Sequence, residues 1–312
     1  MTKYILRRLL QMIPVLIGST FLIFTMVFAL PGDPTAGKCG ERGCSAEFIQ
    51  KFNKEHNLDD PLPIQYAKYV GQLAQGDFGT SYQEVPVREE LGQRYQVTAR
   101  LATIAIVFET LLGISAGVLA GIRKGKFIDN LVLLSTLVVI SIPIFVIGYV
   151  LQFLLGVKWK VFPVTVSSSA AGLDAWWQLL LPGLVLGSVS VAYVARLTRT
   201  NLVENLRADY VRTAIAKGLT RGRAISVHTL RNSLIPVITF IGADFGALLG
   251  GAIVTERIFN IQGVGGYIFT GVHNRDGVVV VGAVTVLILV YLLVNLLVDV
   301  LYGVLDPRIS HD

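Results

Sequence analysis

Apolar runs long enough to cross a lipid bilayer dominate this sequence. A transmembrane helix needs about 20 mostly apolar residues. Six stretches reach or approach that length: 9–30, 101–122, 131–156, 179–196, 234–255 and 278–304. Charged residues make up 15% of the chain, against roughly 25% in soluble domains. We therefore expect an all-α, multi-pass membrane protein with about six transmembrane helices. The first run is too long for a signal-peptide core, so we interpret it as a retained helix.

Basic residues predict how the chain is oriented. They cluster near the N-terminus (Lys3, Arg7, Arg8), in "RKGK" at 123–126, and between Arg196 and Arg231, where eight bases accompany two acids. With six crossings these three regions share one side, which the positive-inside rule makes cytoplasmic. Both termini are then cytoplasmic and segment 31–98 is external. The net charge of +6 thus reflects topology and predicts no nucleic-acid partner.

The predicted organisation has three parts. Residues 1–30 form the N-terminal tail and first helix, 31–98 an external segment, and 99–312 the transmembrane core, which contains a cytoplasmic loop at 197–233. In the external segment, Ser45 can begin one amphipathic helix, and "IQYAKYVGQLAQG" suits a second. We expect a short helical cap there. An irregular loop is the alternative.

The two cysteines, Cys39 and Cys44, both lie in the predicted external segment. An oxidising exterior would permit a disulfide between them, and two free thiols are the alternative. They form no zinc ligand set with the four scattered histidines, so no metal site is expected.

Motifs of enzymes are missing. "AGIRKGKF" lacks the first glycine and the final hydroxyl of a phosphate-binding loop, and neither HExxH nor GxSxG occurs. We predict no catalytic residues, no cofactor and no ATP site in this chain.

Small and ionisable residues inside the apolar runs could line a path. Gly113 and Gly117 share one helix face, as do Gly242 and Gly246; such faces allow close packing within a subunit or form a sliding interface. Ionisable groups in a membrane are costly and often functional. The candidate path residues are Glu109, Gly113, Gly117, Asp244 and Gly246. The alternative for each acid is a neutralising partner.

The loop "DYVRTAIAKGLTRGR" (209–223) has helical texture up to Gly218, and a second helical run follows. Val211, Ala214, Ile215 and Gly218 fall on one face, and glycine commonly ends a helix. The pattern predicts two short helices joined by a sharp turn on the cytoplasmic side.

This loop resembles the cytoplasmic "EAA" loop of ABC importer permeases, especially the B-type subunit of dipeptide and oligopeptide importers. The similarity continues through "ILRRLLQMIPVLIGSTFLIF", "PGDP", "GDFGTSY" and "NLLVDVLYGVLDPRI". Two positions depart from the usual pattern. Arg212 replaces the acid of the general consensus, and "QGVG" at 262–265 lacks the proline of the family's outer loop.

The resemblance implies a type I ABC importer permease in a bacterial cytoplasmic membrane. It implies a heterodimer with a C-type permease subunit, two ATPase subunits that bind ATP and Mg, and an external substrate-binding protein. The residues implied in ATPase coupling are Asp209, Tyr210, Arg212, Ala214, Lys217, Gly218 and Arg221.

Other functions stay open at this point. Similar permeases carry haem, nickel chelates or glutathione instead of peptides. An ion-coupled carrier or a channel would need no coupling loop and would use Glu109 or Asp244 as an ion or proton site. Transport by the reconstituted chain alone would distinguish those classes from an ATP-driven importer.

Overall fold

The computed structural model describes residues 2–28, 44–55, 59–250 and 252–305, and the regular elements in these ranges are helices. Five of the described helices are long and apolar enough to cross a bilayer: Ile5–Phe28, Val87–Ile122, Gly172–Asn205, Arg221–Leu249 and Gly277–Val300. A bent helix pair brings the number to six when it is counted as one span. The all-α, multi-pass architecture is therefore confirmed.

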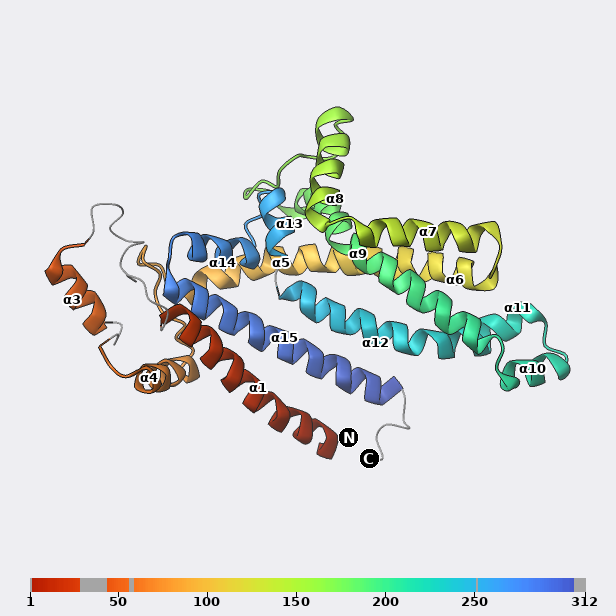
Figure 1. Ribbon diagram of the computed structural model, residues 1–312, viewed down its shortest axis with the longest axis horizontal. Helices are drawn as coiled ribbons and strands as arrows, with labels where there is room; N and C mark the ends of the chain where they lie inside the picture. The colour runs from red at the N-terminus through yellow and green to blue at the C-terminus, as the bar shows by residue number, and fades with distance from the viewer. Residues whose placement is uncertain (1, 29–43, 56–58, 251, 306–312) are drawn as a thin grey trace.

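The third predicted span is not one straight helix. Helix α7 (Phe127–Ser141) and helix α8 (Ile144–Leu151), which continues into the π-helical η3 (Gln152–Lys158), meet at 100°. Pro143 lacks an N–H and disfavours helical backbone in the residue before it, and Ile142 is extended with ψ 126°. The stretch expected to cross as one span, 131–156, is therefore bent at Pro143 instead of straight, and Figure 1 shows α8 projecting sideways from the bundle.

Three other spans differ in length from their predictions. The second span begins at Val87, within the predicted external segment, and not at 101. Helix α9 (Gly172–Asn205) extends well beyond 179–196 at both ends and contains the buried Pro182. Helix α12 (Leu230–Leu249) ends before the predicted 255, and the short α13 (Ile253–Ile258) follows it. Helices α1 (Thr2–Phe28) and α15 (Gly277–Leu305) agree closely with the predictions.

Helix α9 is the centre of the bundle. It packs against one continuous helix made of α5 (Val87–Phe108), η2 (Glu109–Gly113) and α6 (Ile114–Ile122), and also against α7 and α12. The helix backbones approach closely because glycines face α9: a Cβ on Gly113 would lie 2.7 Å from Val194 Cγ1. Leu101, Leu181 and Val185 fill the core beside this contact.

The long helices give the molecule two distinct ends (Figure 1). One end carries the start of α1, the α6–α7 turn and the short helices α10 (Asp209–Ala216) and α11 (Arg221–Arg223). The opposite end carries α3 (Ala46–Glu55), α4 (Leu62–Ala74) and α14 (Val264–His273). The three basic regions thus share one end, as the positive-inside rule predicts.

Helices α3 and α4 occupy the positions predicted for the cap. The N–H of Phe48 donates to Ser45 Oγ at 3.3 Å, which caps α3. Tyrosines fasten α4 to the bundle: Tyr66 donates to the Ile17 carbonyl at 3.0 Å, and the Tyr69 hydroxyl lies 2.7 Å from Thr285 Oγ1. Cys44 is disulfide-bonded, and its predicted partner Cys39 lies outside the described residues.

Candidate functional site

The tip of the molecule, residues 209–229, consists of α10, a turn, α11 and the π-helical η4 (Ala224–Thr229). Helix α10 ends at Gly218, which has φ +92°. The Gly218 N–H donates to Ile215 O at 2.9 Å, and the Leu219 N–H donates to Ala214 O at 3.2 Å. These two bonds are the pair that closes a Schellman motif. The predicted helix break at Gly218 is therefore observed.

The tip is anchored on one side and exposed on the other. Val211 and Ala224 are buried where α10 packs on η4. Tyr210, Ile215 and Val227 are exposed although they are large and apolar. All the predicted coupling residues belong to this unit: Asp209, Tyr210, Arg212, Ala214, Lys217, Gly218 and Arg221. Only Ala214 among them is partly covered, so the tip presents a mixed basic and apolar surface.

An ion pair between the half-buried Arg199 and the buried Asp129 holds the base of the tip. Arg199 on α9 donates from Nε to Asp129 Oδ1 at 2.9 Å and from a terminal nitrogen to Asp129 Oδ2 at 2.8 Å. Asp129 Oδ2 also accepts the Gly125 N–H at 2.8 Å. Such a two-pronged contact fixes orientation as well as distance. It joins the α6–α7 turn to the part of α9 that leads into the tip.

Four of the predicted path residues, Glu109, Gly113, Gly117 and Gly246, are buried, and Asp244 is half-buried. Glu109 is 0% exposed, and the carboxyl group of Asp244 is close enough to interact with it electrostatically. Within the described residues, neither oxygen of Glu109 has a hydrogen-bond partner. Gly113 and Gly117 pack on α9, while Gly246 faces Tyr291 and Val294 on α15. A role in the path stays a prediction for all five residues.

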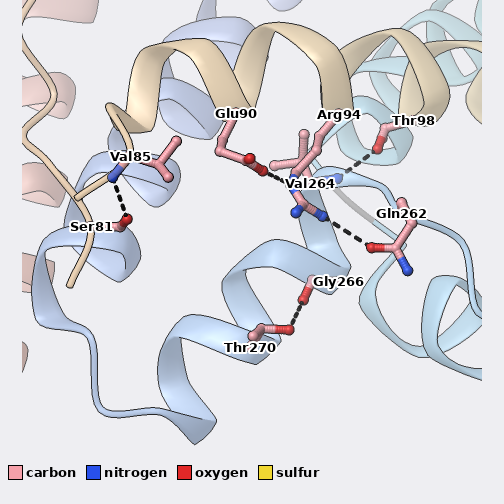
Figure 2. A network of polar contacts seen from close by, with 9 residues as sticks. All are labelled: Ser81, Val85, Glu90, Arg94, Thr98, Gln262, Val264, Gly266 and Thr270. Atoms are coloured by element: carbon pink, nitrogen blue, oxygen red, sulfur yellow. Dashed lines mark hydrogen bonds and ion pairs between the residues drawn. The ribbon is translucent and has the colours of Figure 1, made fainter. Parts of the chain in front are cut away.

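The opposite end holds a buried carboxylate that the sequence did not single out. Glu256 on α13 is 0% exposed; it accepts the Thr98 hydroxyl at 2.9 Å and the Gly266 N–H at 2.7 Å. Thr98 in turn accepts the Val264 N–H at 2.9 Å (Figure 2). We call Glu256, Thr98 and residues 263–266 the cradle. It clamps the start of α14 to α5.

Burial sets the chemistry of the cradle. Desolvation raises the pKa of Glu256 above its ordinary value, while the N–H of Gly266 and the Thr98 hydroxyl lower the pKa in part. Gly263 makes the arrangement possible, because a side chain there would collide with the carboxylate. The available signal was the single acid of "TERIFNIQGVGG", which stands between Thr255 and Arg257. In the sequence, Arg199 is only one of the eight bases between Arg196 and Arg231.

Comparison with known proteins gives two family matches that together cover nearly the whole chain. Residues 113–311 match the binding-protein-dependent transport system inner membrane component. Residues 1–111 match the N-terminal region of the same kind of membrane component. Within the described ranges, no group of three or more His, Cys, Asp or Glu side chains could hold a metal ion.

Curated relatives match over full length. The dipeptide transport system permease protein DppB of Escherichia coli (strain K12) is 40% identical over 337 residues, covering 100% of this chain and 99% of the relative. A di/tripeptide transport system permease protein of Pseudomonas aeruginosa is 38% identical with the same coverage. The glutathione transport system permease protein GsiC of Salmonella paratyphi A is 36% identical, with both chains fully covered. The chain is therefore a multi-pass bacterial inner-membrane protein and belongs to the family of inner membrane components of binding-protein-dependent transport systems.

Proposed function

We propose that this chain is the permease subunit of an ATP-driven importer of dipeptides and oligopeptides. An external binding protein delivers the peptide. A C-type permease subunit completes the path across the membrane, and two separate ATPase subunits bind ATP and Mg and supply the energy. The chain itself forms part of the transport path and catalyses no reaction.

The exposed tip is the observation that carries this proposal. Tyr210, Ile215 and Val227 are exposed on the tip although they are large and apolar, and exposed apolar surface marks sites where a partner binds. The chain lacks a phosphate-binding loop, so ATP energy enters through another protein. The tip is the surface suited to receive it.

The chemistry of the tip supports a division of labour between its residues. Ile215 and Tyr210 supply apolar contact in a cleft of the ATPase subunit, and Ala214 and Gly218 permit close approach. Arg212, Lys217 and Arg221 are exposed cations that form hydrogen bonds to acceptors on the partner. Asp209 begins α10, where a negative charge stabilises the helix N-terminus.

The peptide substrate is supported by two of the relatives described above, whose names state dipeptide or di/tripeptide transport. Glutathione is the alternative, because a relative with a glutathione transport name matches at 36% identity. Haem and nickel chelates are further alternatives from the resemblance alone.

Cross-linking tests the coupling surface directly. We expect I215C to form an efficient cross-link with an ATPase subunit in the assembled importer, with a yield that changes when ATP is added. The matched control is L173C, which is also highly exposed and apolar, at 88%, but lies at the start of α9, far from the tip. Equal cross-linking by both variants, or none by I215C, contradicts the proposal.

Reporter fusions test the orientation that the proposal requires. A fusion after residue 70 in α4 should report an external position, and a fusion after residue 215 in α10 a cytoplasmic one. The reverse pattern would place the tip on the side without ATP and would contradict coupling through it.

A further inference from the structure

A pocket of about 350 Å³ with mixed polar and apolar walls lies toward the end of the molecule opposite the tip. Its walls come from α5, from residues 166–170 and from the first part of α9, and Gln262 closes one side. Two arginines of α5, Arg94 and Arg100, line it together with the carboxylate of Glu90. The pocket is therefore able to receive a negatively charged group, provided that one of these arginines has bonding capacity left.

Arg94 is already engaged by its neighbours. Its Nε donates to Glu90 Oε2 at 2.8 Å, and a terminal nitrogen donates to Gln262 Oε1 at 3.4 Å (Figure 2). Its guanidinium also lies 4.6 Å from the centre of the Tyr267 ring. Arg94 therefore stabilises the wall of the pocket, because its guanidinium is already bound to Glu90, Gln262 and the Tyr267 ring.

Arg100 is the cation that remains. It is half-buried, and no hydrogen bond or ion pair within the described ranges reaches it. The apolar run of α5 begins at the next residue, Leu101, so Arg100 sits at the border of the hydrocarbon layer. A guanidinium at that depth is costly unless it meets water or an anion.

The face of α5 around Arg100 changes from polar to apolar along the helix. Gln93, Gln96, Arg100 and Thr103 follow one another at helical spacing on the less covered side of α5, and Val107 and Leu111 continue the same stripe. The polar members belong to the half nearer the pocket. Because Gln93 and Arg100 line the pocket and precede the apolar run that begins at Leu101, this half of the stripe indicates the entrance of the path.

We infer that Arg100 binds the terminal carboxylate of the transported peptide at the entrance of the path. The inference rests on the proposed function, because it assumes that a peptide enters here. A planar guanidinium can donate two parallel hydrogen bonds to a carboxylate. Each peptide substrate carries one terminal carboxylate regardless of its side chains, so this contact recognises the substrate class without selecting a sequence.

Restoring the charge chemically tests the role of Arg100. The complete importer with R100C is reconstituted in vesicles, and ATP-driven uptake of dialanine is measured. We expect uptake to fall about tenfold, since a hydrogen-bonded charged contact is lost. Treatment with a cationic aminoethyl thiosulfonate should restore much of the uptake, and an anionic sulfonatoethyl thiosulfonate should not. Saturating dialanine during turnover should slow both labelling reactions.

The matched control is R88C, the same substitution on the exposed part of α5 outside the pocket. It should transport normally before and after either reagent. Normal uptake by R100C, restoration by both reagents, or failure of the cationic adduct at complete labelling overturns the assignment. If the unmodified importer shows no ATP-driven peptide uptake, the proposed function itself fails, and that result appears before any variant is compared.

Discussion

The tip and the cradle lie at opposite ends of the molecule and are built in opposite ways. The tip is closed by local hydrogen bonds, such as that from Leu219 to Ala214, and leaves Ile215 exposed. In the cradle, the bond between Thr98 and Glu256 joins residues 158 positions apart, and both side chains are buried. One end is thus shaped mainly by its own sequence, and the other by assembly of the whole fold.

This difference teaches what each end tolerates. Gly218 and Gly222 in the tip have open space for extra atoms, so changes there act on a partner or on the local backbone and leave the rest of the fold intact. The cradle has no spare volume around its carboxylate, so changes there act on folding first. Three substitutions, each chosen to separate these effects, test the comparison.

The largest effect is expected from G218V. Gly218 has φ +92° with nothing near its Cβ position, so the penalty comes from the backbone and amounts to at least about 1–2 kcal/mol for a non-glycine residue. We expect α10 to be reoriented, ATP-driven uptake to fall by more than about tenfold, and insertion into the membrane to continue. Uptake by reconstituted importer and the amount of protein in the membrane are measured together.

G222V is the control for this variant, because Gly222 is equally open and has no positive φ. It should retain most of the uptake. If G218V transports like G222V, the Schellman turn is not needed for coupling.

A smaller loss, of stability rather than coupling, is expected from G263A. The added methyl group displaces the Glu256 carboxylate, and overpacking together with broken hydrogen bonds costs about 2–4 kcal/mol. The midpoint of thermal unfolding in detergent should fall clearly. G92A, on the open side of α5, should leave the midpoint unchanged or raised; similar midpoints for the two variants would contradict the tight cradle.

The smallest expected effect is on how the stability of the protein depends on pH, which the variant E256Q tests. Because burial raises the pKa of Glu256 above its ordinary value of 4.5, the folded protein binds this proton more readily than the unfolded chain. Stability from this group is therefore full below about pH 4.5 and declines as pH rises toward the raised pKa, by at most about 1.4 kcal/mol per pH unit. The difference in unfolding midpoint between wild type and E256Q, followed across that range, should shrink or reverse in favour of E256Q as pH rises. A constant difference would show that Glu256 does not titrate there.

Local patterns were sufficient to predict several elements. Ser45 begins α3, Gly218 ends α10, and the apolar runs correspond to the long helices. Each of these depends on residues close together in the chain. The family resemblance rests on the same kind of contiguous evidence.

Partners distant in the chain could not be predicted. Nothing near Glu256 indicates Thr98, and nothing near Arg199 indicates Asp129, 70 residues away. The positions of proline did not predict where helices end either. Pro14, Pro182 and Pro236 lie inside helices, whereas the chain bends at Pro143. Membrane helices tolerate proline when neighbouring helices satisfy the freed backbone groups, which depends on the complete fold.

The forked contact between Arg199 and Asp129 has a mechanical consequence. A force that pushes on α10 passes into α9, and the two short bonds to Asp129 transfer part of it to the start of α7. Helix α7 leads to the bend at Pro143. A displacement of the tip would thus reach both α9 and the bent pair of α7 and α8. The same displacement would shift α9 along its axis and could change the angle between α7 and α8.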